Sequence, residues 1–278
     1  MTIAVVVDSS SAVTPEIAKQ FSIHLAPLHL MWGKDEYADW IDMDPQEFYS
    51  RLKTAETLPT TSGSVQGEFM NLFENLKETA DGIVAITLSP NTPSAGYDSA
   101  VRAKNLVEGI PIEVVDGNYI TTALGLVATA AGKVANAGGS LEEVIKETQR
   151  VIPKVYTYFN PGSIGYFIRG GRISEADIES REDSHIISQK DGKIVPIEKY
   201  TTRAEARNRL RELLKEHARK DTPLHAGVFH AQALEEAEEL AKEIENSYTC
   251  AELWIGEASP VVAIHLSPES LGLAFYNE

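Results

Sequence analysis

The chain has 278 residues, of which 43% are hydrophobic, so it is long enough for one large or two modest domains with a real core. Its net charge of -16 argues against nucleic acid or an anionic membrane surface as the main partner, because both require a basic face. One cysteine, Cys250, excludes a disulfide within the chain, and there is no run of 18 apolar residues to insert into a membrane. We therefore expect a cytoplasmic protein.

The first half of the chain alternates predicted strands with predicted helices. Apolar runs predict buried strands over residues 3–7, 83–88 and 112–115, and a further strand is expected over 24–32. Helices are expected to begin at Pro15, Pro45 and after Ser140, where a proline or a capping box is present. An apolar stripe over 65–76 and an alanine-rich segment over 119–137 predict two more helices. This order is typical of βαβ units around a parallel sheet.

The pattern changes near residue 153. Short strands are predicted over 186–187, 194–197, 226–229, 253–256 and 261–266, with a hairpin turn at Asp191-Gly192. Helices are predicted over 202–219 and 232–246. The fold class is therefore α/β, with an N-terminal parallel-sheet α/β domain over residues 1–152 and a C-terminal α+β domain with a mainly antiparallel sheet over 153–278.

Three loops in the first half are rich in hydroxyl groups, and each lies where a strand is expected to lead into a helix. They cover residues 8–11, 59–64 and 89–96. Ligands of open α/β sheets bind beyond the carboxyl ends of the strands, where helix N-termini and hydroxyls can hold an anion. Taken singly, each loop is better explained as an ordinary helix cap, because serine and threonine are preferred there. Together they favour a shared anion site.

Several common catalytic motifs are absent from the sequence. It contains no Gly-x-Gly-x-x-Gly, no Gly-x-x-x-x-Gly-Lys, no His-Glu-x-x-His and no Gly-x-Ser-x-Gly. We therefore expect no nucleotide cofactor and no metal. Asp8, at the end of the first strand, leaves one enzymatic alternative open: an α/β phosphohydrolase or small-molecule transferase that uses Asp8 and the hydroxyl-rich loops.

Segments along the whole chain resemble the DegV family, which includes the fatty-acid-binding subunit (FakB) of bacterial fatty acid kinase. The matching segments are 3–10, 59–62, 94–100, 165–173, 262–265 and 271–275. The sequence departs from the family pattern at Ala95-Gly96, Asp116-Gly117, 187–189 and 267–269. The resemblance implies a carrier without catalytic activity. It would hold a long-chain fatty acid and present the carboxyl group to a separate ATP-dependent kinase, which forms acyl phosphate.

The resemblance also implies roles for individual residues. Thr61 and Ser94 would bind the fatty-acid carboxylate, with Ser62 and His265 beside them. An apolar tunnel would draw on six residues, each of which, taken singly, is more typical of ordinary core: Leu28, Leu30, Ile120, Leu124, Ile164 and Phe167. Three basic residues in this acidic chain would dock the partner kinase: Arg169, Arg172 and Arg203.

Overall fold

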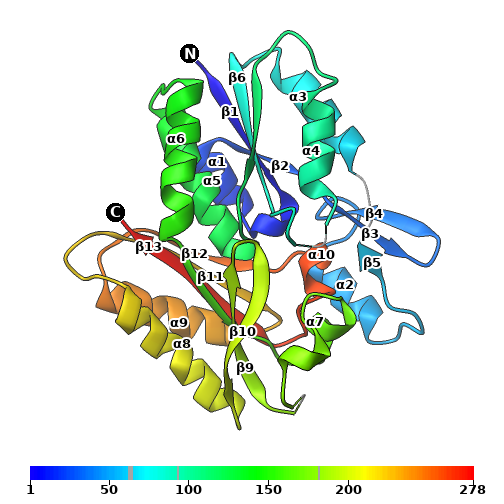
Figure 1. Ribbon diagram of the computed structural model, residues 1–278, viewed down its shortest axis with the longest axis vertical. Coiled ribbons are helices and arrows are strands. Elements are labelled where there is room, and N and C mark those ends of the chain that lie inside the picture. The colour runs from blue at the N-terminus through cyan, green and yellow to red at the C-terminus, as the bar shows by residue number, and fades with distance from the viewer. Residues whose placement is uncertain (62–64, 93, 181) are drawn as a thin grey trace.

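The structure is a computed structural model that describes residues 1–61, 65–92, 94–180 and 182–278 (Figure 1). A parallel four-stranded sheet occupies the first half, in the order β2-β1-β6-β7. Its strands are β1 (Ile3–Asp8), β2 (Ile23–Ala26), β6 (Gly82–Thr87) and β7 (Ile112–Asp116). All six residues of β1 and of β6 are buried, as their continuous apolar runs predict.

Helices cover both faces of this sheet. On one face lie α1 (Pro15–Phe21), α5 (Thr121–Asn136) and α6 (Leu141–Val151), and on the other α3 (Gln66–Leu76) and α4 (Gly96–Lys104) (Figure 1). The expected helix starts are confirmed: Thr14 caps α1 ahead of Pro15, and Ser140 forms a capping box with Glu143.

The second half forms a six-stranded sheet in the order β10-β9-β8-β13-β11-β12. Its strands are β8 (Tyr156–Asn160), β9 (Ser184–Lys190), β10 (Lys193–Tyr200), β11 (Leu224–Ala231), β12 (Cys250–Glu257) and β13 (Ser270–Asn277). Every pair is antiparallel except β11 with β12. The helices α8 (Arg203–His217) and α9 (Leu234–Ser247) pack against it.

Helix α5 lies between the two sheets and contacts strands of both. Each residue from Thr121 to Gly132 is buried. The helix therefore shows little amphipathic pattern, because it has no solvent-facing side along this length. A side chain at Gly125 would meet the carbonyl oxygen of Ser11 at 2.8 Å, so the close approach of α5 to the turn after β1 requires glycine there.

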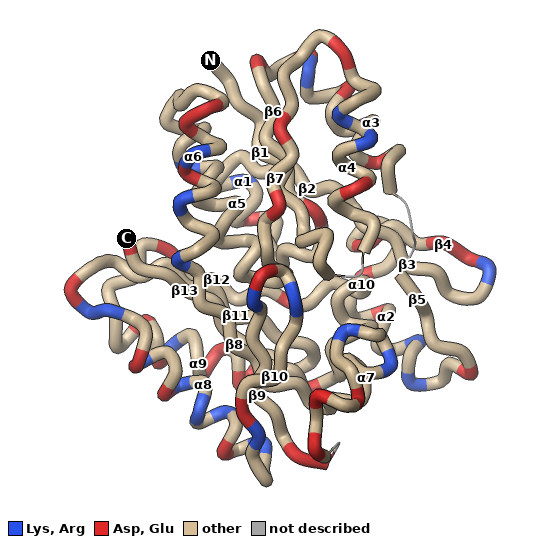
Figure 2. Tube along the Cα trace, viewed as in Figure 1, with Lys and Arg blue, Asp and Glu red and all other residues tan. Residues whose placement is uncertain are grey.

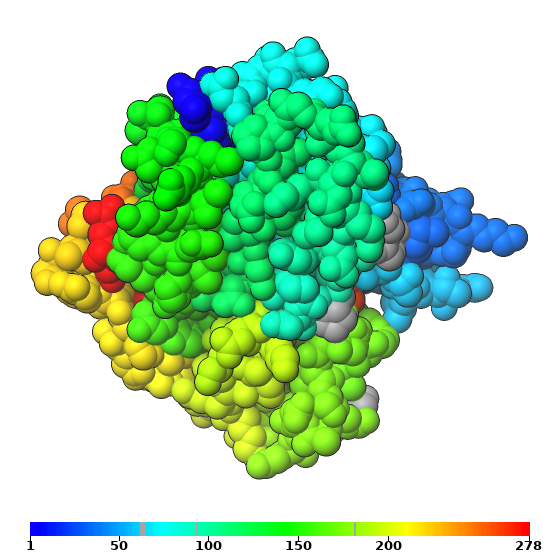
Figure 3. Space-filling model, turned by 45° about the horizontal axis from the view of Figure 1, so that its top comes forward, coloured from blue at the N-terminus to red at the C-terminus, as the bar shows by residue number. Residues whose placement is uncertain are grey.

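A small antiparallel sheet projects from one side of the molecule (Figures 1 and 3). It contains β3 (His29–Trp32), β4 (Asp35–Ala38) and β5 (Thr60–Thr61), and α2 (Pro45–Leu52) lies beside it. Among the described residues there are also two short α-helices, α7 (Gly165–Arg169) and α10 (Pro260–Ala263), and three 3-10 helices, η1 (Ser9–Ser11), η2 (Ile152–Lys154) and η3 (Glu175–Asp177).

The predicted fold class, a parallel α/β half followed by a mainly antiparallel α+β half, is confirmed. The proposed division into domains 1–152 and 153–278 stays a prediction. Two expected strands were wrong. Segment 24–32 breaks at Pro27 into strands of two different sheets, since proline has no N–H for the ladder. Segment 261–266 begins instead as helix α10, for which Pro260 supplies the first residue.

Candidate functional site

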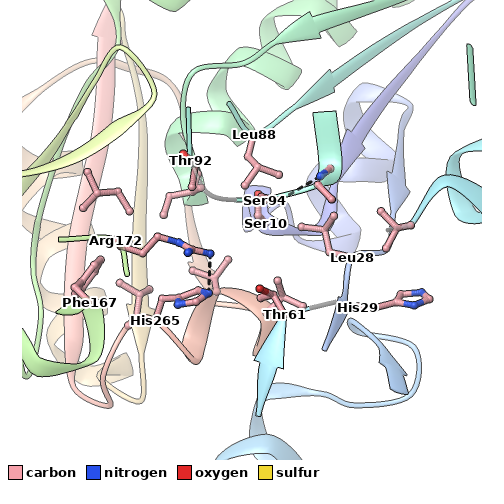
Figure 4. A pocket seen from close by; sticks show the side chains of 18 residues that line it. Ser10, Leu28, His29, Thr61, Leu88, Thr92, Ser94, Phe167, Arg172 and His265 are labelled. Carbon is pink, nitrogen blue, oxygen red and sulfur yellow. Dashed lines mark hydrogen bonds between the residues drawn. The ribbon is translucent and has the colours of Figure 1, made fainter. Parts of the chain in front are cut away.

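A cavity lies where the carboxyl ends of the first sheet face the second half of the chain (Figure 4). Its free space, including the opening to solvent, is about 610 Å³. All three hydroxyl-rich loops contribute to its wall, through Ser10, Thr61, Thr92 and Ser94. The structure therefore brings together, at one place, loops that are up to 84 residues apart in sequence, counting from Ser10 to Ser94.

The polar part of the cavity is formed by Thr61, Ser94, Arg172 and His265, which come from separate parts of the chain (Figure 4). Thr61 ends β5, and Ser94 lies just before α4, where its Oγ accepts the N–H of Gly96 at 3.2 Å. Because that hydroxyl accepts from the backbone, its own proton remains available to a ligand. The arrangement can supply hydroxyl protons to an anion.

Arg172 and His265 form a hydrogen-bonded pair inside the cavity. One guanidinium nitrogen, Nη2, donates to Nε2 of His265 at 3.0 Å, and Nη1 donates to the carbonyl oxygen of Gly170 at 2.9 Å. Burial, reinforced by the charges of Arg172 and Arg169, lowers the pKa of His265 to about 3. The imidazole is therefore neutral at physiological pH. It accepts a hydrogen bond from Arg172 and adds no positive charge beside the guanidinium.

The guanidinium of Arg172 has no carboxylate among the residues that line this cavity. Burial also lowers the pKa of Arg172, which shows that its charge is costly where it lies. In Figure 2, charged positions lie along the helices α3, α6 and α8 and at the tip of the β9–β10 hairpin. A cation in a largely apolar cavity without a counter-charge is suited to an anionic ligand.

Apart from Ser10, His29 and Thr92, the rest of the wall is apolar, so the cavity combines polar groups with a hydrocarbon-like surface. Its apolar side chains are those of Leu28, Val65, Leu88, Ile120, Phe167, Ile194, Val261, Val262 and Leu266. They come from both halves of the chain. This chemistry matches an amphipathic anion, with a charged end and an apolar body.

Comparison with known proteins assigns the chain to a family. The sequence model of the family described as "Uncharacterised protein, DegV family" matches residues 2–278. The chain belongs to the DegV family. It is 34% identical over 279 residues to Protein DegV of Bacillus subtilis, with 99% of each chain covered.

Two solved structures of DegV-family proteins are similar to this fold over 100% of each chain. The crystal structure of DegV from Bacillus subtilis, described as a fatty acid binding protein, has a TM-score of 0.91 at 33% identity. A Thermotoga maritima protein, TM841, whose structure is described as revealing a fatty acid binding function, has a TM-score of 0.88 at 25% identity. The family resemblance read from the sequence motifs is thus confirmed.

The structure distributes the expected tunnel residues of this DegV-family chain between cavity and core. Leu28, Ile120 and Phe167 line the cavity. Leu30, Leu124 and Ile164 are also buried, but they do not line it. Sequence reasoning could not separate the two groups, because all six are apolar residues of buried segments. It missed Ile194, which lies in no matching segment, and Val262, which lies in the matching segment 262–265 but was assigned no role.

The three expected docking arginines lie in different surroundings. Arg172 lines the cavity, and Arg169 lies in an adjoining depression that also contains Thr61, Arg172 and His265. The Arg169 guanidinium lies 4.3 Å from the ring centroid of Tyr166. Arg203 lies on α8, where it forms an ion pair with Glu236 at 3.3 Å and donates to the carbonyl oxygen of Glu269 at 2.9 Å.

Ser62, the remaining expected carboxylate ligand, lies outside the described residues. Among the residues that the structure describes, no group of three or more histidine, cysteine, aspartate or glutamate side chains could hold a metal ion. Within the same residues, no helix is long and apolar enough to cross a membrane.

Asp8, the residue on which the enzymatic alternative depended, is fully buried and does not line the cavity. Its carboxylate accepts the backbone N–H groups of Ser10 at 2.9 Å and Leu88 at 2.7 Å, and also the hydroxyl of Ser10. Burial raises the pKa of Asp8 above its ordinary value. These contacts give it a part in shaping the wall, and they do not favour a phosphohydrolase or transferase.

Proposed function

We propose that this chain is a carrier that binds one long-chain fatty acid in the cavity. The similar proteins from Bacillus subtilis and Thermotoga maritima are described as binding fatty acids. The observation in this chain that carries the proposal is the uncompensated Arg172 at the polar end of an otherwise apolar cavity. A fatty acid supplies both complements, a carboxylate for the guanidinium and an alkyl chain for the wall.

The hydrocarbon tail supplies most of the affinity. Burial of apolar surface stabilises a complex by about 0.8 kcal/mol per CH₂ group, so a chain of ~16 carbons contributes on the order of 12 kcal/mol before ordering costs. Leu28, Ile120 and Phe167 form part of the surface that would receive it. Affinity of this size would retain the ligand through purification.

The carboxylate would lie among Thr61, Ser94 and Arg172. The two hydroxyls would each donate to a carboxylate oxygen, and the family pattern adds Ser62 beside them. Arg172 supplies the positive charge, while neutral His265 holds the guanidinium by accepting its Nη2–H at 3.0 Å. Hydroxyl donors leave carboxylate lone pairs open, which suits a ligand whose carboxyl group must still react.

The second part of the proposal concerns a partner. The carrier would present the carboxyl group to a separate ATP-dependent fatty acid kinase, which transfers a phosphoryl group to it and leaves acyl phosphate on the carrier. Arg169 and Arg172, beside the opening, and Arg203 on α8 would contact the kinase. The chain itself would have no catalytic activity, and the exchange would take place in the cytoplasm.

Native mass spectrometry of the freshly purified protein tests the first part. We expect a mass increment in the fatty-acid range that disappears on denaturation. A bare chain that also fails to bind added palmitate would refute the carrier. Incubation of the loaded carrier with a fatty acid kinase and ATP tests the second part, with acyl phosphate trapped by hydroxylamine as the readout.

A further inference from the structure

Asp39 follows β4, and only 1% of its surface is exposed. It lies beside three segments next to the cavity, at Ser9, Leu28 and Val261. Its Oδ2 accepts the hydroxyl of Ser9 at 2.6 Å, and its Oδ1 accepts the backbone N–H of Val261 at 3.2 Å. The second contact joins residues that are 222 positions apart in sequence. One side chain therefore connects the two halves of the chain.

Val261 belongs to the first turn of α10, where backbone N–H groups have no partner within the helix. Ser259, at the N-cap position, makes no capping hydrogen bond through its side chain. The carboxylate of Asp39 thus takes the part of a cap supplied from a distant segment. A helix of four residues has few internal hydrogen bonds, so its position depends on such outside contacts.

The position of α10 matters because it carries part of the cavity. Val261 and Val262 belong to the apolar wall, and His265 follows directly, with its backbone N–H bonded to the carbonyl of Val262 at 3.0 Å. A shift of α10 would therefore move His265, which accepts a hydrogen bond from Arg172.

The other oxygen of Asp39 fixes the opposite wall. Ser9 Oγ, which donates to Asp39, accepts the backbone N–H of Leu28 at 3.0 Å. The backbone N–H of Asp39 in turn donates to the carbonyl of Leu28 at 2.8 Å. Leu28 lines the cavity, as does Ser10 next to Ser9. The same carboxylate therefore sets the spacing between the wall at Leu28 and the wall at α10.

We propose that Asp39 is a positioning residue whose ionised carboxylate holds α10 and His265 against the first half of the chain, and so slows release of the bound ligand. The ligand in this statement rests on the proposed carrier function. The contact between Asp39 and α10 does not, because both of its partners are residues of the chain itself.

The proposed role of Asp39 predicts that the contact with α10 depends on pH. Burial, with a smaller contribution from the nearby charge of Asp8, raises the pKa of Asp39 to about 7. Asp8 is the charged group that acts on it among the described residues, since the hydroxyls of Ser9 and Ser259 and the N–H of Val261 are neutral. A protonated carboxyl group accepts a weaker hydrogen bond than a carboxylate, so the hold on α10 loosens below about pH 7.

The stability of the fold should change in the opposite direction. A carboxyl group whose pKa is raised by folding stabilises the folded state in its protonated form, and this contribution is lost as the pH rises through about 7. Lower pH should therefore favour the fold at Asp39 while weakening ligand retention. A residue with a purely structural role would change both in the same direction.

The test compares Asp39→Asn with Asp42→Asn in the full-length chain. Asn resembles the protonated carboxyl group at every pH. Asp42 is an exposed carboxylate of the same loop that accepts only the local N–H of Ala38 among the described contacts, at 2.9 Å, so it is a matched control. Transfer of bound palmitate to albumin is followed between about pH 6 and 8.5, together with thermal unfolding and hydrogen exchange of amides 261–266.

We expect Asp39→Asn to release palmitate on the order of tenfold faster at pH 8, the difference between a charged and a neutral hydrogen bond. The wild-type release rate should rise as the pH falls through about 7, and the variant should lack this step. Amides 261–266 should exchange faster in the variant without ligand, while its thermal stability at pH 8 is unchanged or higher. Asp42→Asn should match the wild type.

Two results would overturn the proposal. Wild-type release rates and wild-type exchange at 261–266 in Asp39→Asn would show that the contact holds nothing. A fall in thermal stability that parallels faster release would reduce Asp39 to an ordinary core residue. Failure of the wild type to bind palmitate would refute the carrier function instead, and the exchange of amides 261–266 would still decide whether Asp39 holds α10.

Discussion

Replacement of Arg172 by glutamine separates charge recognition from hydrocarbon binding. The guanidinium lies in the cavity, where it is partly buried, and no carboxylate is among the lining residues. A bound carboxylate would therefore be its counter-ion. A hydrogen bond to a charged group contributes roughly 1.5–3 kcal/mol, which corresponds to about 10-fold to 150-fold in palmitate affinity. The sequence alone assigned Arg172 to kinase docking, and its position in the cavity adds a role in carboxylate binding.

The assay is calorimetric titration with palmitate and, in parallel, with methyl palmitate. The ester keeps the alkyl chain and lacks the charge, so its affinity should be nearly the same for wild type and Arg172→Gln. Arg150→Gln is the control for net charge, because Arg150 is exposed on α6 and bonds to Glu147 within that helix. Without ligand, Arg172→Gln should unfold at the wild-type temperature or above, since a costly buried charge is removed.

Two outcomes would refute the reasoning. Unchanged palmitate affinity in Arg172→Gln would mean that the carboxylate lies elsewhere. Equal losses for palmitate and its methyl ester would mean that the substitution damaged the apolar wall.

The other predictions concern the hydroxyls and the two buried carboxyl groups. Thr61→Val with Ser94→Ala should weaken palmitate binding by roughly 1.5–3 kcal/mol per lost bond with little change in melting temperature, and unchanged binding would exclude both as ligands. In urea titrations, the unfolding free energy of the wild type should fall relative to Asp39→Asn as the pH rises from about 4 to 7, because folding raises this pKa from 3.8 to about 7. Purified protein should hydrolyse neither ATP nor p-nitrophenyl phosphate, and turnover that Asp8→Asn abolishes would restore the phosphohydrolase.

Local signals were sufficient for most of the fold. The continuous apolar runs of β1 and β6 and the capping box at Ser140 have meanings that depend on neighbouring residues alone, and the structure agrees with them. The failure at 261–266 has a different origin. This apolar run satisfies the pattern of a strand, and the decision for helix came from Pro260 together with a carboxylate more than 200 residues away.

The sequence predicted those features of the candidate site that depend only on the chemical type of a side chain. Loops rich in hydroxyls after strands indicated where Thr61 and Ser94 would meet. The distinction between Leu28, which lines the cavity, and Leu30, which does not, depends on the direction of a side chain within the tertiary structure. The position of Arg172 inside the cavity likewise depends on the tertiary structure, because its guanidinium donates to His265, a residue 93 positions away in sequence.

The burial of α5 between two sheets limits how the molecule can admit a ligand. To part the halves would strip one face of a helix buried along Thr121 to Gly132, and exposed apolar area costs about 25 cal/mol per Å². The tip of the β9–β10 hairpin joins the first half of the chain through side chains instead: Asn91 and Thr92 donate to the carbonyl oxygens of Asp191 and Gly192 at 3.1 and 2.6 Å. Helix α5 thus holds the centre of the molecule together, and a ligand would reach the cavity along the edges of the contact between the two halves.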